Sequence, residues 1–139
     1  MVLGLISARP SKISSLRLTW LGPPFSVCRL SSADPVPEWA TKTGAFFGAV
    51  RTADEVSIVC EEQLVPSGVR HEGPFRALKV EGPLDFALVG VLSSLLAPIA
   101  DAGISVFVVS TFDTDYVFVP AGDTDRTAQA LSARGHSIG

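Results

Sequence analysis

The chain has 139 residues, a formal net charge of −3, 47% hydrophobic residues and 18% charged residues. That length is enough for one compact domain or for two small half-domains that share a core. The composition excludes the clustered basic surface that neutralises nucleic-acid phosphates, and no apolar run reaches the roughly 20 residues of a membrane span. The high apolar fraction predicts an interface between subunits as well as a core.

The first residues, 1–15, carry basic residues and serines but no acid. We expect a disordered extension there, with an organelle-targeting segment or an extended start as the alternatives. Residues 16–20 and 25–30 alternate in polarity, and Gly22-Pro23-Pro24 separates them, so we predict that they form a hairpin. Residues 37–40 predict a single helical turn in which Trp39 anchors the packing.

A second hairpin is predicted from residues 46–51 and 56–60, which flank a polar four-residue segment. Residues 67–74 are rich in turn formers and mark the expected boundary between two halves of the chain. The two cysteines, Cys28 and Cys60, fall in predicted strands. We interpret them as reduced core thiols, because a metal site would need further His or Cys residues nearby.

The second half begins with residues 76–81, whose alternation predicts a strand with one buried face. Residues 86–100 carry no charge, and their leucines and isoleucine recur at helical spacing, so we predict a buried helix. Gly103 is expected to end this helix in the C′ position. Pro98 lies inside it and removes the hydrogen bond to the Ser94 carbonyl. The residues on the predicted apolar face are Leu88, Leu92, Leu95 and Ile99.

The rest of the chain predicts two strands and a short helix. Residues 104–110 and 116–119 are rich in β-branched and aromatic side chains and flank a polar corner at 112–115. Asp123 or Thr124 caps the helix, which ends near Gly135. Residues 136–138 are either an edge strand or a frayed tail, with His136 as a solvated cation. Strand, helix, strand, turn and strand make most of a βαββαβ unit.

Several short motifs then carry a family resemblance. They are STFDTDY at 110–116 after GI at 103–104, GPLDF at 82–86, and EVSIVC at 55–60. Over residues 25–139 the chain resembles ACT domain proteins, in particular the stand-alone tandem-ACT branch related to aspartate kinase regulatory domains and the cytosolic arginine sensors. The resemblance implies an α+β, ferredoxin-like (βαββαβ) ACT fold. It has two ACT-like halves in tandem, residues 16–68 and 74–139, and the first has a shortened helix.

The resemblance also implies a ligand site. The arginine sensors have Thr, Phe and Asp at the positions of Thr111, Phe112 and Asp115, which implies a polar contact, packing on the ligand's stem and a partner for a cationic group. The sensors carry acidic residues where this chain has Ala87 and Leu88, so the ligand's identity stays open. With the positions that line the aspartate kinase site, the predicted ligand-binding residues are Asp85, Phe86, Leu88, Val106, Thr111, Phe112, Asp113 and Asp115.

Independent physical reasoning points to the same kind of ligand. The start of the predicted helix offers unpaired N–H groups that suit a carboxylate, and a nearby Asp can pair with an ammonium group. An α-amino acid carries both charges. Asp113 and Asp115 have other interpretations, namely the hydrogen bonding of a tight turn, a catalytic carboxylate pair or a metal site. Because no nucleophile, phosphate-loop or dinucleotide motif is present, we predict no catalytic residue, no metal and no cofactor.

The sequence therefore predicts a regulatory or sensor protein that binds a small amino acid or similar zwitterion and has no catalytic activity of its own. The alternative is a ligand-free ACT-type scaffold that mediates association between proteins. We expect a cytoplasmic homodimer that acts through an effector protein and binds neither nucleic acid nor a membrane.

Overall fold

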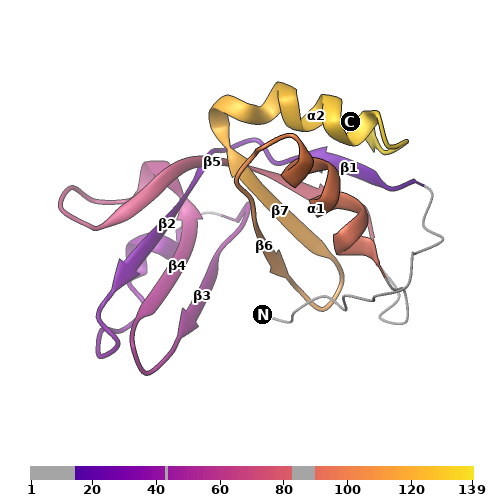
Figure 1. Cartoon of the computed structure of the whole chain (residues 1–139). Helices are drawn as coiled ribbons and strands as arrows, with labels where there is room; N and C mark the ends of the chain where they lie inside the picture. Colours follow the sequence, from indigo (N-terminus) through magenta and orange to yellow (C-terminus); the bar gives the residue numbers. More distant parts are fainter. Residues whose placement is uncertain (1–14, 43, 83–89) are drawn as a thin grey trace. The chain divides into compact units, whose positions relative to one another are not determined.

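The computed structural model describes residues 15–42, 44–82 and 90–139 (Figure 1). The chain divides into two compact units, Leu21–Arg76, called here the first unit, and Met1–Trp20 with Ala77–Gly139, called the second unit. The strand β5 (His71–Val80) gives its first residues to the first unit and its last residues to the second. Residues 16–20, which the sequence placed with the first half, thus belong to the second unit.

The first unit has the strand order of a ferredoxin-like βαββαβ fold with both helices reduced to 3-10 turns. Its ladder runs β3-β4-β2-β5, and all these pairs are antiparallel. This confirms the α+β, ferredoxin-like fold class and the shortened helix. The elements are β2 (Phe25–Leu30), η1 (Glu38–Thr41), β3 (Gly48–Arg51), β4 (Val56–Glu61) and η2 (Glu62–Leu64).

The hairpin predicted between β3 and β4 is confirmed, and Thr52 explains why it turns where it does. The Thr52 N–H donates to the Glu55 carbonyl at 2.9 Å. Its hydroxyl oxygen accepts from the backbone N–H groups of Asp54 and Glu55, at 3.1 and 3.2 Å. A threonine that satisfies the backbone of a tight turn in this way is a common hairpin device.

The other predicted hairpin, between residues 16–20 and 25–30, is wrong. The strand β1 (Arg17–Trp20) pairs with β5 and with β8, and β2 pairs with β4 and β5. The connection between them is engaged elsewhere, because the Pro24 carbonyl accepts a hydrogen bond from the Glu62 N–H at 3.0 Å. Two consecutive prolines also offer no N–H with which to close a hairpin turn.

The core of the first unit contains both cysteines, which are free and fully buried, as the sequence predicted. They share this core with Ala40, Val56 and Ile58, and Trp39 packs against it. The Cys60 thiol donates a hydrogen bond to Cys28. This bond lowers the pKa of Cys28 and, together with burial, raises the pKa of Cys60 above its ordinary value.

The second unit has two α-helices and one strand more than the first unit, because β1 lies between β5 and β8. Its ladder runs β6-β7-β5-β1-β8, so β8 is an edge strand, which settles the alternative left open for residues 136–138. Besides β1 and the end of β5, its elements are α1 (Val91–Asp101), β6 (Phe107–Ser110), β7 (Asp115–Pro120), η3 (Ala121–Asp123), α2 (Thr124–Ser132) and β8 (Ser137–Ile138).

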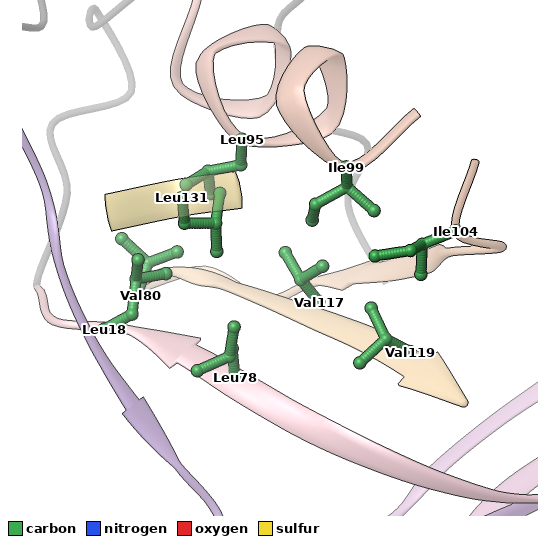
Figure 2. Close-up of a cluster of buried hydrophobic side chains, with 9 residues drawn as sticks. All are labelled: Leu18, Leu78, Val80, Leu95, Ile99, Ile104, Val117, Val119 and Leu131. Carbon is green, nitrogen blue, oxygen red and sulfur yellow. The ribbon is translucent and has the colours of Figure 1, made fainter. Parts of the chain in front are cut away.

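The helices of the second unit cover a continuous apolar core (Figure 2). Leu95 and Ile99 from α1 and Leu131 from α2 face side chains of the strands below them. The spacing that predicted an apolar helix face is confirmed for Leu92, Leu95 and Ile99, all of which are buried. The full cluster is Leu18, Leu78, Val80, Leu95, Ile99, Ile104, Val117, Val119 and Leu131.

The ends of α1 are set by two glycines. The helix begins at Val91, later than the predicted residue 86, because Gly90 before it has a left-handed φ of 79°. Its end confirms the role of Gly103, whose φ is 74°. The Gly103 N–H donates to Ala100 and the Ile104 N–H donates to Ile99, at 2.9 and 3.2 Å, which is the Schellman pattern.

His136 is not the solvated cation expected from the sequence, because it is only 5% exposed. Its Nδ1 accepts a hydrogen bond from the Leu16 N–H at 3.1 Å, so the ring proton lies on Nε2, which is 3.2 Å from the Ser94 carbonyl oxygen. Pro98 has no N–H to give that carbonyl. The neutral imidazole thus supplies the donor that the proline removes from α1 and holds the start of β1 at the same time.

Candidate functional site

The candidate site is the corner between β6 and β7, residues 110–115. Ser110 and Asp115 lie opposite each other at its base, and the Ser110 hydroxyl donates to Asp115 Oδ1 at 2.5 Å. Above them, the Thr111 N–H and hydroxyl both donate to the Thr114 carbonyl, at 2.8 and 3.0 Å. The corner is therefore held rigidly by its own side chains, which confirms the turn chemistry considered for this segment.

One hydrogen bond ties this corner to the end of β5. The Thr114 hydroxyl is buried and donates to the Val80 carbonyl at 2.6 Å. The chain continues from Val80 through Glu81, whose carboxylate accepts from the Thr19 hydroxyl at 2.5 Å, into the segment before α1. The corner thus lies beside the end of β5. The predicted residues Asp85, Phe86 and Leu88 lie outside the described residues.

The other predicted site residues divide into two groups. Thr111, Phe112 and Asp113 are exposed at the tip of the corner, and Phe112 is 78% exposed. Asp115 is only 7% exposed, with one carboxylate oxygen already bonded to Ser110. Val106 is half-buried and packs against the core of the second unit. The corner therefore presents an aromatic ring and a carboxylate outward and keeps a second carboxylate within.

Sequence reasoning missed two residues of this corner, Ser110 and Thr114. Both are buried polar residues, and each donates a hydrogen bond that fixes the geometry of the site. The hairpin register offered a signal for Ser110, since it pairs with Asp115 across the turn. No sequence signal indicated that Thr114 reaches the Val80 carbonyl, because that contact joins residues 34 apart.

The described side chains of the corner offer charged and aromatic groups that could bind a ligand. Asp113 points into solvent at the tip and Asp115 is buried at the base, so the two do not share one exposed face. In the described part of the chain, no three His, Cys, Asp or Glu side chains are placed to hold a metal ion. What the corner offers is negative charge and an aromatic surface, which suit a ligand with a cationic group and an apolar stem.

Models of known protein families match two parts of the chain. The ACT domain model matches residues 70–133, which include β5, both α-helices and the β6–β7 corner. Residues 70–133 of the chain therefore form an ACT domain. The family resemblance drawn from the sequence is therefore confirmed. A second family model, described only as an N-terminal domain, matches residues 24–68 of this ACT protein.

Solved structures share the fold of this chain. A protein from Agrobacterium tumefaciens is 37% identical, with a TM-score of 0.84 and coverage of 89% of this chain and 92% of its own. A Vibrio cholerae protein of unknown function, described as a possible transport protein, is 17% identical (TM-score 0.72, coverage 88% and 91%). The regulatory subunit of aspartate kinase from Thermus thermophilus is 9% identical (TM-score 0.56, coverage 81% and 93%) and shares the fold. No curated protein sequence matches the chain.

The search for membrane spans gave a negative result. Among the described helices, none combines the length and the apolar character that crossing a bilayer requires.

Proposed function

We propose that this ACT protein binds a small amino acid or a similar zwitterion and acts as a regulatory sensor without catalytic activity of its own. ACT domains have a regulatory, ligand-binding role in general, and the ACT domain of residues 70–133 gives this chain that role. The more specific proposal, that the ligand is an amino acid, rests on the charges around the β6–β7 corner. The observation that carries it is the hydrogen bond from Thr114 to Val80, which holds the corner against the end of β5.

The two poles of an amino acid would meet different elements. The carboxylate of Asp115 suits the ammonium group, and exposed Phe112 packs on the ligand's stem. The first N–H groups of α1 suit the carboxylate, because they have no partner within the helix and carry partial positive charge. We further propose that the protein works as a cytoplasmic homodimer. Ligand binding changes the subunit interface, and an effector protein responds to that change. The size of the change depends on how much more tightly the ligand binds one conformation of the dimer than the other.

A scaffold without a ligand is the second candidate, and one observation favours it. The groups that would face a ligand already have partners, since Asp115 accepts from Ser110 and the Thr111 hydroxyl bonds within the turn. A ligand that uses Asp115 must share or displace the Ser110 hydroxyl. The binding test below separates the two candidates.

The test is thermal unfolding of the full chain with each common L-amino acid at millimolar concentration. A ligand at a hundred times its dissociation constant adds roughly 2.7 kcal/mol to the free energy of unfolding. Asp115→Asn should reduce this gain, and Asp125→Asn, which removes an exposed carboxylate from α2, should not. Unfolding that no amino acid delays would favour the scaffold.

A further inference from the structure

A second polar pocket lies in the first unit, away from every residue predicted from the sequence. It has a volume of about 180 Å³ and is bordered by β2, β4 and the start of β5. These three strands are neighbours in the ladder of this unit, with β2 between the other two (Figure 1). Nothing in the function proposed above uses this pocket.

The strand register places most of the lining side chains on one face of the sheet, and Cys28 and His71, which also border the pocket, alternate to the other face. Val27 and Arg29 are two residues apart on β2, so they point to the same side. Arg29 is paired with Ser57 on β4, and Val27 is paired with Glu72 on β5. Cys28, between Val27 and Arg29, points to the core on the opposite face. The pocket therefore opens on the polar face of the sheet, and half-buried Val27 and Ser57 lie at its base.

Two arginines meet at this pocket, and neither forms an ion pair with a described residue. Arg29 and Arg70 are neighbours across β2 and β5, since the Arg29 N–H donates to the Arg70 carbonyl at 3.0 Å. The Arg29 guanidinium also donates to the Asp54 carbonyl, which is uncharged, at 3.2 Å. Among the described residues, the ion pairs join Arg126 to Asp123 and Arg134 to Asp101 instead. Like charges directly opposite each other in a sheet repel.

The same pocket also contains negative charge. Glu55, directly before β4, and Glu72 on β5 both line it, so cationic and anionic side chains border one small space. A guanidinium pair suits a carboxylate, which it can hold through two parallel hydrogen bonds, and a carboxylate suits an ammonium group. The volume is below the roughly 300–1,000 Å³ of pockets that hold drug-sized ligands, so only a small metabolite fits.

We propose that this pocket is a second binding site for a small α-amino acid. Arg29 and Arg70 hold the ligand's carboxylate, Glu55 and Glu72 hold its ammonium group, and Val27 packs against its stem. The site is separate from the β6–β7 corner and needs no residue of it. Its specificity lies in requiring both charges on one small molecule.

The experiment is calorimetric titration of the full chain with each common L-amino acid, carried out on the Asp115→Asn variant so that the β6–β7 corner contributes least. Arg70→Ala in this background should weaken binding roughly tenfold or more, the effect of losing one charge-assisted hydrogen bond. Glu72→Gln should weaken it too. Arg17→Ala is the matched control, because it removes an exposed arginine from the second unit and should leave the affinity unchanged. Analogues of the best ligand that lack the amino group or the carboxylate should bind more weakly than the amino acid.

The outcomes separate this site from the first one. Binding that persists in Asp115→Asn and falls in Arg70→Ala and Glu72→Gln supports the second site. Binding that is lost in Asp115→Asn alone, or that is unchanged in both Arg70→Ala and Glu72→Gln, overturns the second site and leaves the β6–β7 corner as the site. The absence of any amino-acid binding to the wild-type chain overturns both proposals. Arg70 and Glu72 are exposed, so circular dichroism should show that their variants fold.

Discussion

Both units of this protein are built on a β-sheet, but different elements cover the sheet in each. The first unit has only the 3-10 turns η1 and η2 on its sheet, and the second has the helices α1 and α2. The buried cluster of the first unit contains two cysteines and an alanine, whereas that of the second consists entirely of leucine, isoleucine and valine. The strand order alone therefore does not determine how much apolar surface a unit buries.

The sequence explains the difference. Pro66 follows η2, so that segment cannot continue as an α-helix, whereas Pro35 and Pro37 lie before η1, which starts at Glu38. Helix α1 contains Pro98, and there His136 supplies the missing hydrogen bond to Ser94. We infer that the second unit supplies most of the stability, and the first presents a polar sheet face for recognition.

The largest expected effect is from the core of the second unit. Leu95→Ala removes a fully buried side chain from between α1 and the strands and should cost about 2–5 kcal/mol of unfolding free energy. Ile58→Ala, an equally buried position in the first unit, should cost less, because the thin cover of η1 can relax into the cavity. Urea unfolding measures both values. A larger loss for Ile58→Ala would contradict the difference drawn between the units.

The next effect concerns the two histidines. His136→Ala leaves the Leu16 N–H and the Ser94 carbonyl without partners and should cost about 2–4 kcal/mol. His71→Ala is the matched control in the first unit, because His71 is exposed, and it should change the stability by less than about 0.5 kcal/mol. Thermal unfolding of the two variants compares them. Equal effects would show that the imidazole of His136 is not the link between α1 and β1.

A backbone position in the first unit gives a smaller effect. A Cβ added at Gly73 would lie 2.9 Å from Ser26 Oγ and 3.0 Å from the Phe25 carbonyl oxygen, at a positive φ of 154°. Gly73→Ala should therefore destabilise the chain by about 1–3 kcal/mol. Gly122→Ala, where no atom lies within 4 Å, should change it by less than about 0.5 kcal/mol. Urea unfolding that gives the same value for both would show that β2 and β5 do not approach as closely as described.

The smallest effect is expected at the candidate site. Ser110→Ala removes the hydroxyl that donates to Asp115 and should cost about 1–2 kcal/mol. Ser105→Ala, at an exposed position before β6, should be close to neutral. If Asp115 binds the ligand's ammonium group, Ser110→Ala should retain ligand binding even though it unfolds at a lower temperature. A variant as stable as the wild type would mean that the Ser110–Asp115 bond does not hold the corner.

The sequence predicted the parts of the fold that depend on local chemistry. The hairpin turn at residues 52–55, the end of α1 at Gly103 and the apolar face of α1 each depend on residues that are close together in the sequence. These three features were predicted correctly. Prediction from the sequence failed where a distant partner decides the structure. The strand β1 pairs with β5 and β8 rather than with β2. His136 is buried against the Ser94 carbonyl, to which Pro98, far away in the sequence, cannot donate a hydrogen bond.

The candidate site shows the same division. The polar corner at residues 112–115 was recognisable from its turn-forming residues, but the bond between Thr114 and Val80 was not. The pocket of the first unit gave no sequence signal either, because Arg29, Ser57 and Glu72 come from three strands and become neighbours only through the register.

The most direct test of the account is to map amide chemical shifts of the full chain by NMR while titrating the amino acid that most raises the unfolding temperature. We predict that the largest changes fall on residues 111–115 and on the first turn of α1. The second site would add a separate set on β2 and the start of β5. Spectra that no common amino acid alters, or changes confined to segments outside both sites, would contradict the claim that this ACT protein recognises an amino acid.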